Sequence, residues 1–250
     1  MDDPTKRFSN RVAEYVRWRP RYPAALVETL SREHGLQPSH VIADIGSGTG
    51  ILSELFLEHG NTVFGVEPNA EMRGAAESLL AGQKRFRSVA ASAEATGLDA
   101  SSVDWVTAGQ AFHWFDADKA KREFKRILKP GGQVALIWNE RRDDTPFLRE
   151  YESLLREFGT DYAQVQHRDG TKDMRLEKFL SDLKLHRFDN GQSFDYEGLK
   201  GRLLSSSYAP QSGHPKHEPM LQALRTLFDK HAAKGVVEFK YDTHVYVGKV

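Results

Sequence analysis

A short apolar run, Val41–Ile45, leads directly into the glycine-rich turn Gly46–Gly50, and a stripe of apolar residues begins at Ile51. The apolar run between turn residues predicts a buried strand. The spacing of the apolar residues from Ile51 to Phe56 predicts a helix that ends at Gly60. Glycines permit positive φ and let backbone N–H groups approach a ligand closely. This order predicts an open α/β sheet that binds a ligand at the carboxyl edge of its strands.

The same alternation of strands and helices continues through the first part of the chain. Short apolar runs between turn signals predict strands, and apolar residues that recur every three or four positions predict helices. The predicted strands are Thr62–Val66, Phe86–Ala90, Val103–Thr107 and Gln133–Trp138, and the predicted helices are Ala24–His34, Ala70–Ala81 and a stripe from Ala117 to Leu128 that stops at a turn, Lys129–Gly132. Strands that alternate with helices predict right-handed crossovers and a parallel sheet covered on both faces.

The second part of the chain has a different pattern. Two charged helices are predicted between Pro146 and Leu183, a strand over Leu185–Phe188 and a helix around Met220–Phe228. From Val237 to Val247 apolar and polar residues alternate, which predicts a half-exposed antiparallel strand. We therefore expect a Rossmann-like α/β fold with a mostly parallel seven-stranded sheet, an antiparallel C-terminal strand and helices on both faces.

Composition limits the classes of function. With 35 Lys and Arg against 35 Asp and Glu, the 250 residues have a formal net charge of +0 and lack the basic field of a dedicated nucleic-acid binder. The absence of cysteine excludes disulfides, thiolate zinc sites and cysteine nucleophiles. No apolar stretch approaches the roughly 20 residues needed to cross a bilayer, and the first residues lack a signal-peptide core. We expect a cytoplasmic protein that does not enter a membrane.

The spacing of the glycines selects among nucleotide-binding turns. A dinucleotide fingerprint requires Gly or Ala as the sixth residue counted from Gly46, and that position is Ile51. A phosphate-binding P-loop requires Gly-Lys-Ser/Thr, and the turn contains no lysine. A nicotinamide-dependent dehydrogenase is therefore disfavoured.

The segment Asp44-Ile-Gly-Ser-Gly-Thr-Gly50 resembles the first motif of class I S-adenosylmethionine-dependent methyltransferases. Glu67, at the end of the next predicted strand, supports the resemblance because an acidic side chain there can accept both ribose hydroxyls. Ser92-Ala93-Glu94, where the family places an acidic residue near the adenine, and the turn Lys129–Gly132 extend the resemblance over residues 8–140. It implies a class I methyltransferase fold, S-adenosylmethionine as cofactor and S-adenosylhomocysteine as product.

The resemblance also implies a set of cofactor-binding residues around the glycine turn. They are Tyr15, Arg19, Asp44, Gly46, Ser47, Gly48, Thr49, Gly50, Glu67, Pro68, Met72, Ala93, Glu94, Gln110, Ala111 and Phe112. Tyr15 and Arg19 would close over the cofactor, with the planar guanidinium holding the methionine carboxylate. For Arg19 a plain surface cation is an equally good interpretation, and an acidic residue such as Glu67, taken alone, is more often a solvated loop acid.

Two segments, Gly109–Asp116 and Tyr15–Pro23, look like those of small-molecule methyltransferases similar to trans-aconitate and other carboxylate methyltransferases. The acceptor would be a small molecule methylated on a carboxylate or hydroxyl oxygen. The Asn/Asp-Pro-Pro-Tyr/Phe segment typical of amino-methylating DNA enzymes is missing, which argues against a flipped base. A cofactor-binding sensor or partner subunit without catalysis is the alternative.

His113 is the main titratable candidate beside the transferred methyl group, as a hydrogen-bond donor to the acceptor, a packed structural histidine or a general base. The predicted acceptor-side residues are Trp114, Trp138, Ser206 and Tyr208, with core packing for the tryptophans and a capped helix end for Ser206 and Tyr208 as alternatives.

We expect one domain, organised as a cofactor cap (1–40), a cofactor-binding half (41–140), acceptor-side helices and lid (141–235) and a final strand (236–250). His214, His217 and His231 lack an acidic partner at zinc-motif spacing, so no metal is expected. The protein is expected to act as a monomer or weak homodimer, without nucleic acid or membrane partners.

Overall fold

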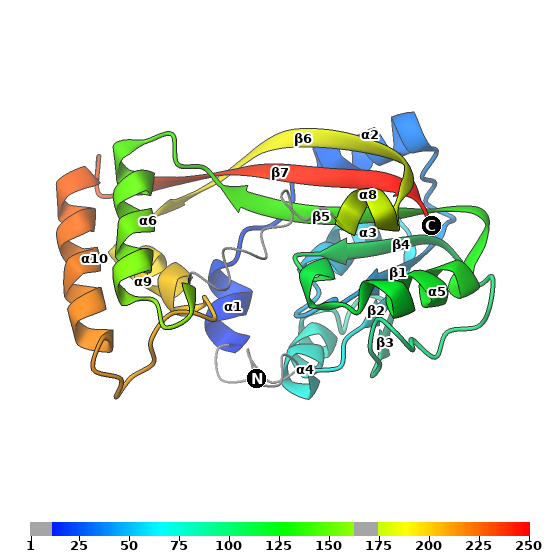
Figure 1. Ribbon diagram of the computed structural model, residues 1–250, viewed down its shortest axis with the longest axis horizontal. Coiled ribbons are helices and arrows are strands. Elements are labelled where there is room, and N and C mark those ends of the chain that lie inside the picture. The colour runs from blue at the N-terminus through cyan, green and yellow to red at the C-terminus, as the bar shows by residue number, and fades with distance from the viewer. Residues whose placement is uncertain (1–11, 163–174) are drawn as a thin grey trace.

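A seven-stranded sheet in the order β3-β2-β1-β4-β5-β7-β6 forms the centre of the computed structural model, which describes residues 12–162 and 175–250 (Figure 1). The strands are β1 Val41–Ile45, β2 Thr62–Val66, β3 Phe86–Val89, β4 Val103–Gly109, β5 Leu128–Arg141, β6 Ser181–Phe194 and β7 Val237–Lys249. The helices are α1 Val12–Trp18, α2 Ala25–His34, α3 Ile51–His59, α4 Ala70–Leu79, the 3₁₀ turn η3 Phe112–Trp114, α5 Ala117–Ile127, α6 Pro146–Phe158, α8 Arg175–Phe179, α9 Tyr196–Leu204 and α10 His217–His231. None of these described helices has the length and hydropathy to cross a bilayer.

The sheet is parallel from β3 to β5, and β7 runs antiparallel to both β5 and β6. This confirms the predicted mostly parallel sheet with an antiparallel C-terminal strand. Successive residues of β1 point to opposite faces: Ile42 joins an apolar cluster with α2 and α3, and Ala43 joins a cluster with α5 and α8. Helices therefore cover both faces, as the alternation of strands and helices predicted.

Strand β5 is longer than the sequence suggested, and the predicted turn Lys129–Gly132 lies inside it. Val103 pairs with Leu128 and Trp105 pairs with Gln133, so four residues of β5 oppose one residue of β4. The segment is thus a large bulge, which Gly131 accommodates with φ of 81°. Pro130, Gly131 and Gly132 are typical of a turn, but pairing with β4 on either side makes this segment an irregular part of the strand.

The two antiparallel strands also differ from their predicted outlines. The predicted strand Leu185–Phe188 is the middle of the much longer β6, an edge strand whose polar residues gain their pairing from β7. The half-exposed pattern of β7 holds only in its first part, because Val245–Gly248 are buried between β5 and β6. Apolar alternation alone did not reveal how far neighbouring strands would cover these segments.

One end of β6 and one end of β7 extend beyond the parallel strands to a third apolar cluster, which is formed with α6, α9 and α10 at the left of Figure 1. Of the two charged helices expected before Leu183, α6 has 13 residues and α8 has five, and residues 163–174 lie outside the described ones. Helix α1 packs on α9 through Trp18. A Cβ on Gly201 would lie 2.0 Å from Trp18 Nε1, so this packing requires a glycine.

Candidate functional site

The glycine turn after β1 has the backbone conformation that its composition predicted. Gly46, Gly48 and Gly50 have φ values of 67°, 56° and 85°, which side-chain-bearing residues rarely adopt. A Cβ on Gly46 would lie 2.6 Å from Ala111 Cβ, and one on Gly50 would lie 2.8 Å from Leu80 Cδ1. A side chain at Gly46 or Gly50 would therefore clash with these neighbours and force the loop to move.

Glu67, at the end of β2, fastens this loop. Its Oε2 accepts the Gly48 N–H at 2.9 Å and its Oε1 accepts the Asn69 N–H at 2.8 Å. Burial raises the pKa of the Glu67 carboxyl above its ordinary value, although both N–H donors oppose the rise. Each carboxylate oxygen can accept a further hydrogen bond, so the side chain retains capacity for a ligand's hydroxyl groups.

Asp44, the last polar residue of β1, lies on the floor of the pocket and is fully buried. Its carboxylate accepts the hydroxyls of Ser53 at 2.6 Å and Thr107 at 3.1 Å. Burial raises the pKa of Asp44 to about 6, because these hydroxyls compensate only part of the desolvation. The site therefore holds a carboxylate that is costly to ionise.

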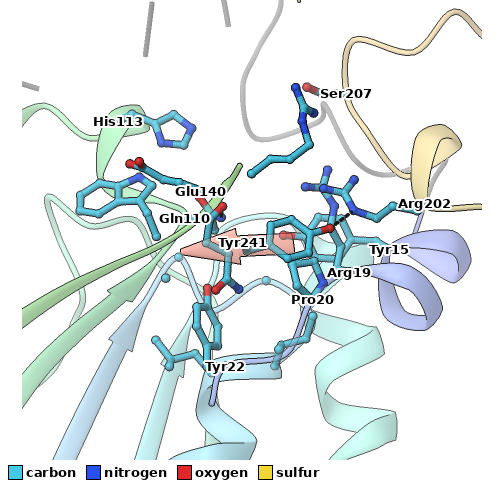
Figure 2. A pocket seen from close by; sticks show the side chains of 18 of the residues that line it. Tyr15, Arg19, Pro20, Tyr22, Gln110, His113, Glu140, Arg202, Ser207 and Tyr241 are labelled. Carbon is cyan, nitrogen blue, oxygen red and sulfur yellow. Dashed lines mark hydrogen bonds between the residues drawn. The ribbon is translucent and has the colours of Figure 1, made fainter. Parts of the chain in front are cut away.

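A pocket of about 430 Å³ opens beside the loop (Figure 2). The predicted site residues in its lining are Tyr15, Arg19, Asp44, Gly46, Ser47, Gly48, Thr49, Gln110, His113, Trp114, Trp138 and Tyr208. Those outside its lining are Gly50, Glu67, Pro68, Met72, Ala93, Glu94, Ala111, Phe112 and Ser206. The structure thus brings α1, the glycine turn and the segment after β4 together, and leaves the residues predicted near the ribose and adenine beside the pocket.

Some of the residues outside the lining have clear local roles. Glu94 Oε1 accepts the Asp116 N–H at 3.0 Å, at the start of α5. Phe112 is fully buried and packs against Phe179 with ring centroids 4.7 Å apart. Met72, near Gly48, is also buried. These contacts hold in place the segments that surround the pocket.

Gln110 stands out at the end of β4 because it has φ of 56° without being a glycine. Its Nε2 donates to the Asn139 carbonyl at 2.9 Å and its backbone N–H donates to the Ile137 carbonyl at 2.8 Å. Such strained residues persist where surrounding contacts hold them, and they cluster at functional sites. Gln110, the strained residue, is one of those that the resemblance assigned to cofactor binding.

The other end of the pocket lies at η3 and the end of β5. His113 and Trp114 line it with ring centroids 4.8 Å apart, and Figure 2 shows Glu140 beside His113. Trp138 contributes to the lining but is only 3% exposed, since its ring packs against Phe112 and Tyr246. Trp138 is therefore mainly a core residue, the alternative that the sequence left open.

Helix α9 supplies a wall that the sequence did not predict. Arg202 is 6% exposed, lines the pocket, and donates through Nε to Tyr241 Oη at 3.0 Å and through Nη1 to Ser206 Oγ at 3.1 Å. Ser206 thus lies behind the wall, and its neighbour Ser207 faces the pocket. Tyr208 lines the pocket too; burial alone would raise its pKa, but the charges of arginines such as Arg141 lower it below its ordinary value.

Sequence reasoning missed 16 of the residues that line the pocket, among them Tyr22, Asn139, Glu140, Arg141, Arg202, Ser207 and Tyr241. Arg202 carried a usable signal because it lies on the buried face of α9 with Leu199 and Leu203. An arginine on an apolar helix face is unusual unless it is paired. Tyr22 and Ser207 lie in loops, and Asn139, Glu140 and Arg141 lie at the end of β5, where no periodicity marks them.

Metal ligands do not gather anywhere in the described residues: no group of three or more His, Asp or Glu side chains there can hold an ion. His217 Nδ1 lies 2.8 Å from the Pro210 carbonyl, and His231 Nε2 lies 3.1 Å from Glu150 Oε2. The absence of a metal cofactor stays a prediction.

Comparison with known proteins gives one consistent picture. A family described as a methyltransferase domain matches residues 43–136. A methyltransferase-like protein of Schizosaccharomyces pombe is 32% identical over 209 residues, which cover 77% of this chain and 79% of that protein. A methyltransferase of Mycobacterium tuberculosis is 29% identical over 92% of this chain and 89% of its own length.

Solved structures agree in fold. A protein from Anaeromyxobacter dehalogenans named as a type II methyltransferase matches with a TM-score of 0.69 and 24% identity, over 92% of this chain and 97% of its own. A phosphoethanolamine N-methyltransferase from Haemonchus contortus, solved with S-adenosylhomocysteine, matches with a TM-score of 0.54 and 16% identity, over 99% of this chain and 58% of its own. The loop geometry, the fold and these relatives together place the chain among the class I S-adenosylmethionine-dependent methyltransferases.

Proposed function

We propose that this methyltransferase methylates an oxygen atom, of a carboxylate or a hydroxyl group, on a small-molecule acceptor. The observation that carries the proposal is the pocket of about 430 Å³ between the glycine turn on one side and α1 and α9 on the other. This volume is in the range of small-molecule sites. Its lining of guanidinium, phenol and amide groups suits a polar acceptor rather than a hydrocarbon.

The loop geometry supports the assignment of cofactor residues. When bound, S-adenosylmethionine supplies an electrophilic methyl carbon on a sulfonium. The positive φ values of Gly46 and Gly48 leave open the space that a Cβ would occupy, and Glu67 retains acceptor capacity for ribose hydroxyls. Arg19 offers its guanidinium for the methionine carboxylate, as the resemblance to carboxylate methyltransferases implies.

His113 and Gln110 are assigned to the acceptor end of the pocket and the cofactor's methionine end, respectively. Methyl transfer is an in-line displacement that depends on alignment and exclusion of water. A carboxylate acceptor needs no general base, and a hydroxyl acceptor benefits from one. We assign to His113 the positioning of the acceptor through a hydrogen bond, with a general-base role as the alternative.

The test is turnover with defined acceptors. Purified protein is incubated with S-adenosylmethionine and panels of small carboxylic acids, hydroxy compounds and amines, and S-adenosylhomocysteine and the methylated product are measured by mass spectrometry. We expect a methyl ester or methyl ether. Methylation confined to amines, proteins or nucleic acids would contradict the proposal.

Two variants separate the roles of His113 once an acceptor works. If His113 positions the acceptor, His113→Gln retains much of the rate that His113→Ala loses, because an amide still donates. If it acts as a base, both variants lose roughly 10²–10⁴-fold in turnover, and the loss shrinks at high pH. Binding of S-adenosylhomocysteine serves as the control, since neither role requires it to change.

A further inference from the structure

The wall formed by α1 and α9 contains two cations whose charges no carboxylate of the described residues balances. Arg202 is 94% buried by the protein and is held by phenol and hydroxyl oxygens of Tyr241 and Ser206. Arg19 donates through Nη2 to the Ser205 carbonyl at 2.9 Å, and its guanidinium stacks on the Tyr15 ring at 4.7 Å. All of these partners are neutral.

The two guanidiniums act on each other. Burial and the like charge of Arg202 both lower the pKa of Arg19 below its ordinary value. Arginine nevertheless stays protonated near neutral pH, so both residues remain cations. Figure 2 shows the two guanidinium groups side by side at one end of the pocket. Two like charges so placed destabilise the empty pocket unless an anion compensates them.

Of the four carboxylates that line the pocket, three have other partners, Glu140 among them through His244 Nδ1 at 3.4 Å, and Asp143 forms no ion pair with Arg19 or Arg202 in the described part of the chain. Glu152 pairs with Arg141 and with Arg156, and Asp44 accepts the hydroxyls on the pocket floor. Arg19 Nε is buried without a hydrogen-bond partner among the described residues. The pocket wall therefore presents donor groups and about two positive charges to whatever occupies it.

We propose that Arg202 is a specificity-determining residue that binds a carboxylate group of the acceptor, while its neighbour Arg19 serves the methionine carboxylate of the cofactor. The inference rests on the proposed function and deepens it by naming the group that recognises the acceptor. The buried Arg202 and the partly buried Arg19 together call for two negative charges, and the cofactor carries only one carboxylate. Tyr241 and Ser206 occupy Nε and Nη1 of Arg202, which sets the direction of the remaining N–H groups.

The test measures anion binding directly, with protein saturated with S-adenosylhomocysteine. Succinate and benzoate are titrated by calorimetry, each against its neutral amide, and inorganic phosphate is titrated as a separate probe. Wild-type protein is expected to bind at least one carboxylate tenfold or more tightly than its amide. Arg202→Gln is expected to abolish that preference and to change the affinity for S-adenosylhomocysteine less than threefold.

Matched variants separate recognition from folding. Arg225→Gln removes an exposed arginine that pairs with Asp229 on α10, and should change neither affinity. Tyr241→Phe removes the oxygen that orients Arg202 but keeps the ring, and should weaken carboxylate binding about threefold. This variant provides the test if Arg202→Gln fails to fold. Arg19→Gln, by contrast, should lower the affinity for S-adenosylhomocysteine.

Three outcomes would overturn the proposal. They are a wild type without preference for either carboxylate, a preference that survives in folded Arg202→Gln or carboxylate binding that is unchanged in Tyr241→Phe, and tighter binding of phosphate than of any carboxylate. Turnover is measured in parallel. An acceptor that is methylated equally well without Arg202 refutes this inference alone, whereas carboxylate binding at Arg202 without methylation of any small molecule refutes the proposed function.

Discussion

The two sides of the pocket are built in different ways. The cofactor side comes from one stretch of chain, Asp44 to Glu67, and consists largely of backbone whose shape depends on glycine. The acceptor side, which in our proposal also supplies Tyr15 and Arg19 to the cofactor, is assembled from α1, β5, α9 and β7, and its surface consists of long side chains such as Arg202. A backbone site is recognisable from local sequence, whereas a side-chain site exists only where distant segments meet.

The largest expected effect tests the backbone side. Gly46→Ala introduces a Cβ 2.6 Å from Ala111 Cβ at a position with φ of 67°. The left-handed conformation costs an alanine about 1–2 kcal/mol, and the clash also displaces the loop. We expect S-adenosylhomocysteine binding to fall about 100-fold or more by calorimetry. Gly74→Ala, in open space on α4, is the control and should bind normally.

Glu67→Ala tests whether the backbone side depends on a single side chain. The change removes the acceptor for the Gly48 and Asn69 N–H groups as well as the group proposed to hold the ribose. Each lost hydrogen bond to a charged group is worth about 1.5–3 kcal/mol before compensation. We expect affinity for S-adenosylhomocysteine to fall at least about tenfold. Glu58→Ala, at an exposed position, is the reference. An unchanged dissociation constant in Glu67→Ala would show that Glu67 is only an acidic loop residue without a role in cofactor binding.

Gly201→Ala tests how the acceptor side is assembled. The new Cβ would lie 2.0 Å from Trp18 Nε1, so α1 must shift away from α9. Overpacking of this kind costs about 1–3 kcal/mol, which we expect as a lower free energy of unfolding and weaker cofactor binding, because α1 carries Tyr15. In a Trp18→Ala background the substitution should have almost no effect. Equal effects in both backgrounds would show that the contact between Trp18 and Gly201 does not fix the position of α1 on α9.

The smallest expected effect concerns Asp44. Its folded-state pKa of about 6 lies above the roughly 3.9 of an unfolded carboxyl, so stability from the proton held by the native state is present at low pH and is lost as pH rises through about 6. Asp44→Asn cannot ionise. We expect it to raise the unfolding free energy of the ligand-free protein by about 1–3 kcal/mol at pH 7.5 and by little near pH 4. A gain independent of pH in denaturant titrations would contradict this.

Local patterns predicted most of the parallel sheet correctly. The apolar runs at β1 and β2 match the observed strands, because a parallel strand that is buried on both faces is mostly apolar. The same logic failed at β6, where an edge strand is polar and its length is set by pairing with β7. It also failed at Lys129–Gly132, where turn residues form a bulge inside β5.

The sequence alone determined the class of fold, the glycine loop and the family, since each depends on residues that are neighbours in the chain. Only the tertiary structure decided which side chains meet in the pocket: Arg202 and Tyr241 touch across 39 positions of sequence, and Arg19 reaches Ser205 across 186. Contacts over such separations depend on how helices and strands pack against one another. The periodicity of residues within one segment does not reveal which other segment it will contact. The residues that we propose for recognition of the acceptor therefore lie in the part of the molecule that sequence patterns describe least.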